Sequence, residues 1–141
     1  MARRSSIQGD VKLRRLLRRV GSQIESDLRP AMVQAANLVL QTQTFLIPRD
    51  TGDAGHALTA FVSKSGLDAE IGLRGKKDNR RYFYTKFLEY GTKGYTRGET
   101  SVPARPSHPW LRPSYDLNRE QIVQLIQRAI ASTLKKAAEA K

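Results

Sequence analysis

Two carboxylates and an imidazole lie close together in residues 50–56 (DTGDAGH). Asp50, Asp53 and His56 are residue types that hold a divalent metal ion, and such a site would make the chain a metal-dependent nuclease. Their spacing does not match a calcium loop, which needs a longer run of oxygen ligands and a final Glu, nor an HExxH helix. Because Asp and Gly also shape turns, we predict a turn here and keep the metal site as an alternative.

The composition excludes several other kinds of catalytic and metal site. The chain has no cysteine, which excludes a thiol nucleophile and a zinc site built on thiolates, and it has only 2 His. Residues 91–94 (GTKG) lack the order of a phosphate-binding loop, and Ser107 and His108 lack the glycines of a nucleophile elbow. We therefore expect no enzyme, no catalytic residue, no cofactor and no metal.

A cluster of positive charge marks the N-terminal part of the chain. Lys and Arg number 25 against 13 Asp and Glu, and the net charge of +12 indicates an acidic partner such as nucleic acid. Residues 3–19 hold seven of these cations and a single acid, Asp10. No base-reading motif accompanies them, so a DNA contact would be independent of sequence; the alternative is the solvated face of an amphipathic helix. The residues predicted to face DNA are Arg3, Arg4, Lys12, Arg14, Arg15, Arg18 and Arg19.

Aromatic side chains gather in residues 82–95, beside several lysines and arginines. Such a mixture is typical of stacking platforms for single-stranded nucleic acid. Phe83, Phe87 and Tyr90, however, recur at helical spacing. We therefore predict a short helix over residues 82–90 that packs this stripe into the core.

Glu89 falls in the last turn of that predicted helix, where the helix dipole opposes a negative charge. A neighbouring cation would offset this effect. Arg105 and Arg112 are the nearest candidates after the following loop. We predict a structural ion pair between Glu89 and one of these arginines, rather than a catalytic acid.

Helical periodicity dominates both ends of the chain. Apolar or small residues recur every three or four positions from residue 10 to residue 46, and we expect Pro30 to kink this long helix without ending it. The same spacing of apolar residues predicts a second helix over residues 115–138. The apolar face of the first helix begins with Leu13, Leu17, Val20, Ile24 and Leu28, and that of the second contains Ile122, Ile126, Ile130, Thr133 and Ala137.

Shorter elements are predicted between these helices. Residues 58–62 and 67–73 alternate apolar and polar side chains, which is typical of a hairpin with its turn at residues 64–66. We predict loops at residues 75–81 and 92–101, and an extended path for residues 102–113, which hold four prolines. The expected fold class is α+β, with the long kinked N-terminal helix and the C-terminal helix packed on a small, mainly antiparallel sheet.

The length of 141 residues fits one domain, with residues 1–9 as a flexible basic arm. The sequence has no run of about 18 apolar residues, so no membrane span is expected. The basic N-terminus is not followed by an apolar stretch, so no secretory signal is expected.

Three motifs occur in order along the chain. PRDTG at residues 48–52 follows the long helix, FLEYGT occupies residues 87–92, and a proline-rich stretch (PARPSHPWLRPSY) occupies residues 103–115. This arrangement resembles the tail-completion, or head–tail joining, proteins of tailed bacteriophages, whose stretches read P-x-x-T-G, E-aromatic-G-T, and R-P followed by aromatic-Leu-x-Pro. The resemblance covers about residues 10–138.

The resemblance implies a subunit of the virion neck, made in the bacterial host cytoplasm. Copies would form a ring, with six-fold symmetry favoured and twelve-fold possible, between the head connector and the tail. Its partners would be other neck and tail proteins, and the double-stranded DNA that passes through the lumen. Such a ring needs two different contact patches on each subunit, and we predict Tyr95, Arg97 and Trp110 at the subunit interface. The alternative function is sequence-nonspecific binding of nucleic acid by the Arg-rich N-terminal helix.

Overall fold

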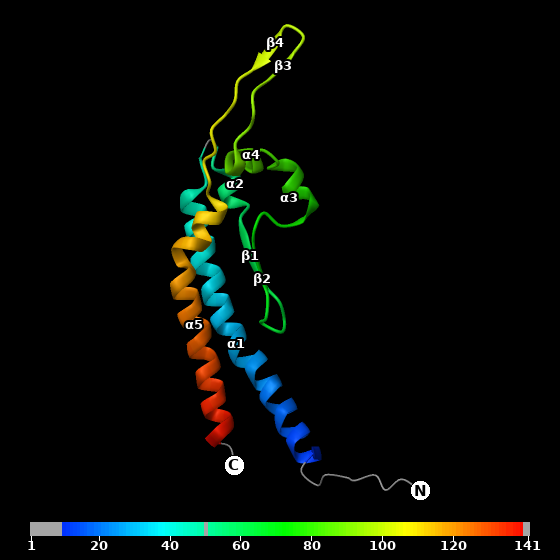
Figure 1. Cartoon of the computed structure of the whole chain (residues 1–141), viewed down its shortest axis with the longest axis vertical. Helices are drawn as coiled ribbons and strands as arrows, with labels where there is room; N and C mark the ends of the chain where they lie inside the picture. The colour runs from blue at the N-terminus through cyan, green and yellow to red at the C-terminus, as the bar shows by residue number, and fades with distance from the viewer. Residues whose placement is uncertain (1–9, 50, 140–141) are drawn as a thin grey trace, which may run out of the picture.

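Two long helices that lie side by side and antiparallel form the spine of the molecule (Figure 1). The structure is a computed structural model that describes residues 10–49 and 51–139. In chain order the elements are α1 (Asp10–Leu46), α2 (Asp53–His56), β1 (Thr59–Val62), β2 (Ala69–Gly72), α3 (Gly75–Arg81), α4 (Thr85–Tyr90), β3 (Tyr95–Arg97), β4 (Thr100–Val102) and α5 (Leu111–Glu139). The predicted α+β class, with a long N-terminal helix, a C-terminal helix and small antiparallel sheets, is confirmed.

α1 runs through Pro30 without a break, which confirms the prediction of one helix rather than two. The apolar face of α1 is buried only in the second half of the helix. The buried residues there are mostly small, which lets neighbouring elements approach α1 closely: Leu28, Ala31, Ala35, Ala36 and Val39. The first half of this face is not buried, since Leu13 is 54% exposed and Leu17 is 61% exposed. α5 covers only the later part of α1, so periodicity alone did not indicate where the covering element ends.

α5 packs along α1 through a seam that polar side chains hold at both ends. Near the start of α5, the Asn118 amide donates to Thr42 Oγ1 at 2.7 Å. Near its end, the buried Thr133 hydroxyl donates to Asp27 Oδ2 at 2.9 Å, and Lys136 pairs with the same oxygen at 3.3 Å. These contacts join residues more than 70 positions apart in the sequence and fix the register of the two helices.

β1 and β2 form an antiparallel hairpin that lies against α1, with Thr59 opposite Gly72 and Val62 opposite Ala69. The predicted turn at residues 64–66 is confirmed, because the turn is closed by a hydrogen bond from the Ser63 N–H to the Asp68 carbonyl. Gly66 has φ 72°, and a Cβ atom there would lie 2.6 Å from the Cα of Arg29. Glycine is therefore required both by the turn and by the close approach to α1.

Residues 75–81 form the helix α3, so the predicted loop is wrong, although its side chains are largely exposed as expected. The polar composition of this segment resembles a loop, but Lys and Arg are good helix formers. The amide of Asn79 also donates to the Gly75 carbonyl at 2.8 Å, which satisfies one backbone acceptor of the first turn.

Residues 92–101 also differ from the predicted loop, since β3 and β4 pair in a second antiparallel hairpin with Tyr95 opposite Val102. We call residues 92–105 the hairpin arm; Figure 1 shows it projecting beyond the ends of the two long helices. Its base is held where the Thr92 and Arg105 backbones exchange hydrogen bonds of 3.0 and 2.9 Å. A Cβ atom on Gly91 or Gly94 would lie 2.8 Å from the facing backbone, so these glycines permit the close pairing.

The main core lies where α1, α2, α4 and the start of α5 meet. Trp110 is 4% exposed and packs in one cluster with Ile47, Ala54, Leu58 and Tyr82. α5 begins at Leu111 rather than at residue 115, so Pro113 lies in its first turn, where a proline costs no helical hydrogen bond. None of the helices in the described part of the chain is both long enough and apolar enough to cross a membrane.

Candidate assembly and nucleic-acid surfaces

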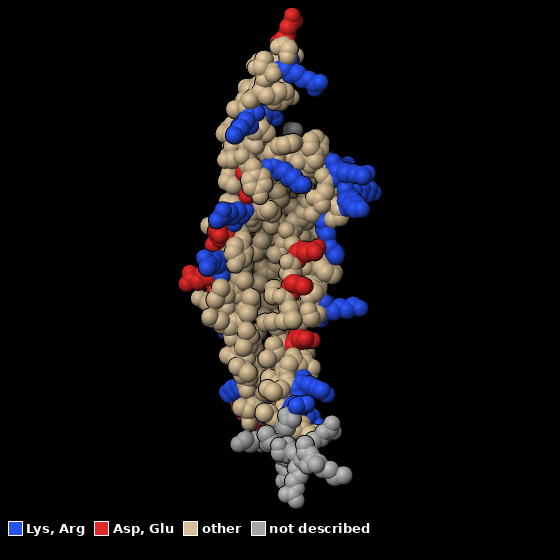
Figure 2. All heavy atoms as spheres, turned by 45° about the vertical axis from the view of Figure 1, so that its right-hand side comes forward, with Lys and Arg blue, Asp and Glu red and all other residues tan. Residues whose placement is uncertain are grey.

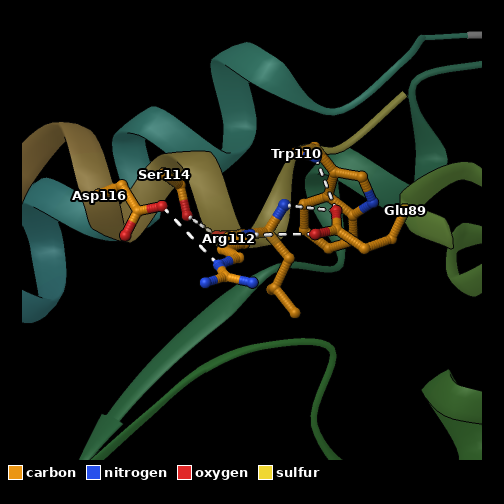
Figure 3. A network of polar contacts seen from close by, with 6 residues as sticks. Glu89, Trp110, Arg112, Ser114 and Asp116 are labelled. Carbon is orange, nitrogen blue, oxygen red and sulfur yellow. Dashed lines mark hydrogen bonds and ion pairs between the residues drawn. The ribbon is translucent and has the colours of Figure 1, made fainter. Parts of the chain in front are cut away.

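The carboxylate of Glu89, in the last turn of α4, caps the N-terminus of α5 (Figure 3). Oε2 accepts the backbone N–H of Trp110 at 2.7 Å and that of Leu111 at 2.8 Å, and Oε1 accepts the N–H of Arg112 at 3.2 Å. The next residue, Pro113, has no N–H. The N–H groups that the start of a helix leaves without partners are thus all accounted for by one side chain and one proline. We call this contact the Glu89 cap.

The position of Glu89 between two helices determines its electrostatics. Its charge lies at the unfavourable C-terminal end of the short α4, but at the favourable N-terminal end of the 29-residue α5. Burial acts to raise the pKa of this carboxyl, while the three backbone N–H donors lower it, and the net result is a pKa below the ordinary value of 4.5. Glu89 therefore remains an anion whose role is structural.

The predicted ion pair of Glu89 with Arg105 or Arg112 is wrong. Arg112 contacts the carboxylate through its backbone N–H, while its guanidinium lies 3.9 Å from Asp116 (Figure 3). Arg105 lines a groove that Glu89 does not border, and its backbone pairs with Thr92. The cation that the sequence argument required is replaced by the partial positive charge of a helix N-terminus.

The residues predicted at a subunit interface separate into two groups. Trp110 is not available for a subunit interface, because its ring is buried in the core and its Nε1–H donates to the Thr85 carbonyl at 3.3 Å. Tyr95 and Arg97 are exposed on the hairpin arm, as an interface role requires. Their availability is consistent with the prediction and does not test it.

Phe83, Phe87 and Tyr90 face outward, so their predicted inward packing is wrong. Phe83 is 58% exposed and Phe87 is 51% exposed, and their rings meet edge to face at 6.0 Å. The buried side chains are instead Tyr82, Thr85 and Glu89. Both sets have helical spacing, so the pattern alone did not decide which one faces the core.

A groove of about 730 Å³ lies beside these aromatic rings. Tyr84 and Phe87 supply apolar surface, and Arg49, Arg81 and Arg105 supply positive charge. Such a lining favours a partner that combines negative charge with apolar or aromatic surface.

Lys12, Arg15, Arg18 and Arg19 are exposed on α1, as predicted. Arg14 is also exposed, but it takes part in an interaction within the chain. Arg3 and Arg4, with the predicted basic arm, lie outside the described residues. The first half of α1 thus presents positive charge on one side.

The opposite side of the same half-helix presents an apolar surface. We call Leu13, Leu16, Leu17 and Val20 the apolar stripe; three of them are exposed and Val20 is half-buried. Leu16 and Val20 border a pocket that also contacts Ala137 near the end of α5. Apolar side chains exposed in a row at one end of a molecule are typical of an interaction site.

The turn after α1 contains the residues of the alternative metal site. Asp53 and His56 are exposed at the two ends of α2, and Asp50 lies outside the described residues. Among the residues that the structure describes, no group of three or more His, Asp or Glu side chains is placed to hold a metal ion.

No family model, curated protein or solved structure matches this chain.

Proposed function

We propose that this chain is a structural subunit of the head–tail junction of a tailed bacteriophage. Copies of it close into a ring that joins the head connector to the tail and lets DNA pass. The subunit carries out no bond-making chemistry and needs no cofactor. It is made in the host cytoplasm and is incorporated into the virion neck.

The Glu89 cap supports the resemblance on which this proposal rests. Of the three motifs that carry the resemblance, the second contains Glu89 and the third contains the Trp-Leu-Arg-Pro sequence at residues 110–113. In the structure these motifs form one joint, because the carboxylate of the first accepts the N–H groups of the second. A shared pair of motifs with one physical role is a stronger sign of a common fold than two unrelated matches.

The observation that carries the assembly role is the apolar stripe. Leu13, Leu16 and Leu17 leave between 47% and 61% of their surface exposed on a helix whose other half is buried on the same face. Fully burying an exposed leucine contributes about 1.5–3 kcal/mol, and about half of each surface is still exposed here, so a neighbouring subunit that covers all three gains about 2–4 kcal/mol. The exposed hairpin arm supplies a second, different surface, which the head-to-tail contacts of a ring require.

The first experiment is to determine the size and shape of the purified full chain by light scattering and negative-stain electron microscopy. We expect closed rings of one stoichiometry, six-fold favoured and twelve-fold possible. The double variant Leu13→Gln, Leu17→Gln is expected to remain folded and to lose the rings, while Leu13→Met, Leu17→Met keeps them. Rings in both variants would exclude the apolar stripe from the interface, and a monomer at every concentration would contradict self-assembly.

A second candidate function is sequence-nonspecific nucleic-acid binding by the N-terminal helix. The exposed cations Lys12, Arg15, Arg18 and Arg19 favour it. It predicts a monomer that binds duplex DNA at moderate salt and is absent from virions. Neutralising these four residues would weaken DNA binding without lowering the melting temperature, because they lie on the solvent side of α1; a large loss of thermal stability would contradict that placement.

A further inference from the structure

The densest group of cations in the view of Figure 2 lies at the position of α3. We call Lys76, Lys77, Arg80 and Arg81 the α3 patch; all four are exposed. They stand at positions i, i+1, i+4 and i+5 of one short helix, so their side chains lie on one side of it. In the loop that the sequence predicts for this segment, the four charges would have no common direction.

Only two of the four cations of the α3 patch suit the helix dipole, because Arg80 and Arg81 lie in the last turn, where cations are favourable. Lys76 and Lys77 lie in the first turn, at the positive end of the helix dipole, where cations are unfavourable. The N-cap residue is Arg74, and it makes no side-chain capping hydrogen bond. Asp78 is the single acid in the helix. A helix that keeps cations at its positive end carries an electrostatic cost, and such local conflicts are typical of functional surfaces.

The α3 patch continues into the groove beside α4. Arg81 belongs to both, since it lines the groove and its guanidinium carbon lies 5.4 Å from the centre of the Tyr82 ring. Arg49 and Arg105 also line the groove, together with the exposed rings of Phe87 and Tyr84 and the acidic side chain of Asp53. The α3 patch is therefore continued by a groove whose lining includes three arginines and one acid.

We infer that the α3 patch binds the phosphodiester backbone of nucleic acid without reading its sequence. Lysine and arginine side chains that project from one face donate to phosphate oxygens, and none of the described residues of the patch is held in an ion pair with an acid. A second copy of the chain is a poorer occupant, because the sequence has 13 acids against 25 cations. This site is separate from the N-terminal arginines, and it does not depend on ring formation.

The salt dependence of binding follows from the number of phosphate contacts. Each neutralised phosphate contributes about 0.9 to the slope of log K against log salt on duplex DNA, so four contacts contribute a slope of about 3.6. The contribution of the α3 patch to affinity is then expected to fall about a hundredfold between 50 and 200 mM salt.

The test is fluorescence anisotropy of the full chain with a labelled 20-base-pair duplex and with an oligo(dT) strand of the same length. The test variant is Lys76→Gln, Lys77→Gln, Arg80→Gln, Arg81→Gln. The control variant removes the same charge from four scattered exposed positions: Lys64→Gln, Arg119→Gln, Arg128→Gln, Lys135→Gln. We expect the test variant to lose at least tenfold in affinity and about 3–4 units of slope on the duplex, while the control changes affinity by less than about threefold.

Several outcomes would overturn the inference. Equal losses in the test and control variants would show that net charge alone drives binding, and a wild-type chain that binds neither duplex nor oligo(dT) at 50 mM salt would remove the site. Binding of poly-glutamate in preference to both nucleic acids would assign the patch to an acidic protein surface. Preference between duplex and oligo(dT) identifies which nucleic acid supplies the phosphates.

A variant with fewer substitutions distinguishes a loss of binding from a loss of folding. Lys76→Gln, Lys77→Gln removes two cations from the positive end of α3, so it relieves rather than adds repulsion, and the protein is expected to keep its circular dichroism spectrum. It is expected to lose about 1.8 units of slope. An unchanged slope in this folded variant would contradict the inference, even if rings form as proposed above.

Discussion

The Glu89 cap makes a sharp prediction about stability, because one side chain serves three backbone donors. In Glu89→Ala the buried N–H of Trp110 loses its acceptor, which costs about 1–3 kcal/mol. The N–H groups of Leu111 and Arg112 are only partly buried, so water replaces the carboxylate there and the cost is that of a lost N-cap, about 1–2 kcal/mol. The expected total is about 3 kcal/mol of the free energy of unfolding.

The assay is thermal unfolding followed by circular dichroism, together with urea titration of the same variants. For a chain of this size a loss of about 3 kcal/mol lowers the melting temperature by about 10 °C. Glu89→Gln keeps one acceptor oxygen and is expected to lose about half as much. Glu120→Ala, on the exposed face of α5, is the control and is expected to change stability by less than about 0.5 kcal/mol. Equal stability of Glu89→Ala and the control would refute the cap.

The same carboxylate predicts the pH dependence. Its pKa is below the ordinary value of 4.5 in the folded chain, because the three backbone donors outweigh the effect of burial. A depressed folded pKa means that the stabilisation is complete above the unfolded pKa and is lost as the pH falls through the folded pKa. The difference in the free energy of unfolding between wild type and Glu89→Gln is therefore expected to be constant above about pH 5.5 and to shrink below pH 4.5. A difference that grows on acidification would contradict this assignment.

Two further predictions concern the packing of the hairpin and of α1. Gly66→Ala is expected to destabilise the chain by about 2–3 kcal/mol in urea titration, since the new methyl group meets the Arg29 backbone. Gly98→Ala, in the open tip of the hairpin arm, is the control and adds only the strain of its positive φ, about 1 kcal/mol. Equal effects of the two substitutions would argue against the contact between Gly66 and Arg29. Gln43→Met is expected to leave stability unchanged or to raise it by about 1 kcal/mol, because none of the described residues donates a hydrogen bond to the buried Gln43 Oε1; a loss above 2 kcal/mol would show that the amide is satisfied.

Periodicity predicted the elements that are long or flanked by clear turn residues. α1 and the stripe of α5 follow from apolar residues at every third or fourth position, and the β1–β2 hairpin follows from alternation around a Ser-Gly turn. These predictions are reliable because many residues in each segment fit the same helical or strand spacing. They could not indicate how far along α1 the partner helix extends, and so the exposed apolar stripe was missed.

The Glu89 cap could not be predicted from residue types. The position of Glu89 at the end of a short helix indicates that its charge needs a positive partner. That partner is the N-terminus of α5, which is made of backbone N–H groups and is not visible among the side-chain types. That N-terminus begins four residues earlier than predicted, since Pro113 was interpreted as excluding a helix when it occupies the first turn. One misplaced boundary therefore hid the partner.

The short helices were the least predictable part of the candidate surfaces. In α4 two sets of residues share helical spacing, and only the contact with Trp110 decides that Thr85 and Glu89 face inward. In α3 the charged residues looked like a loop, and only the observed helix gives the four cations a common direction. The signal that was present in the sequence is the excess of Lys and Arg over Asp in residues 74–81.

Electron cryomicroscopy of tailed phage particles purified from a lysate that contains this chain tests the proposed role most directly. The proposal predicts a closed ring of this subunit between the head connector and the tail, with Leu13 and Leu17 of each copy covered by its neighbour. Complete, infective particles that contain no copy of the chain would contradict it.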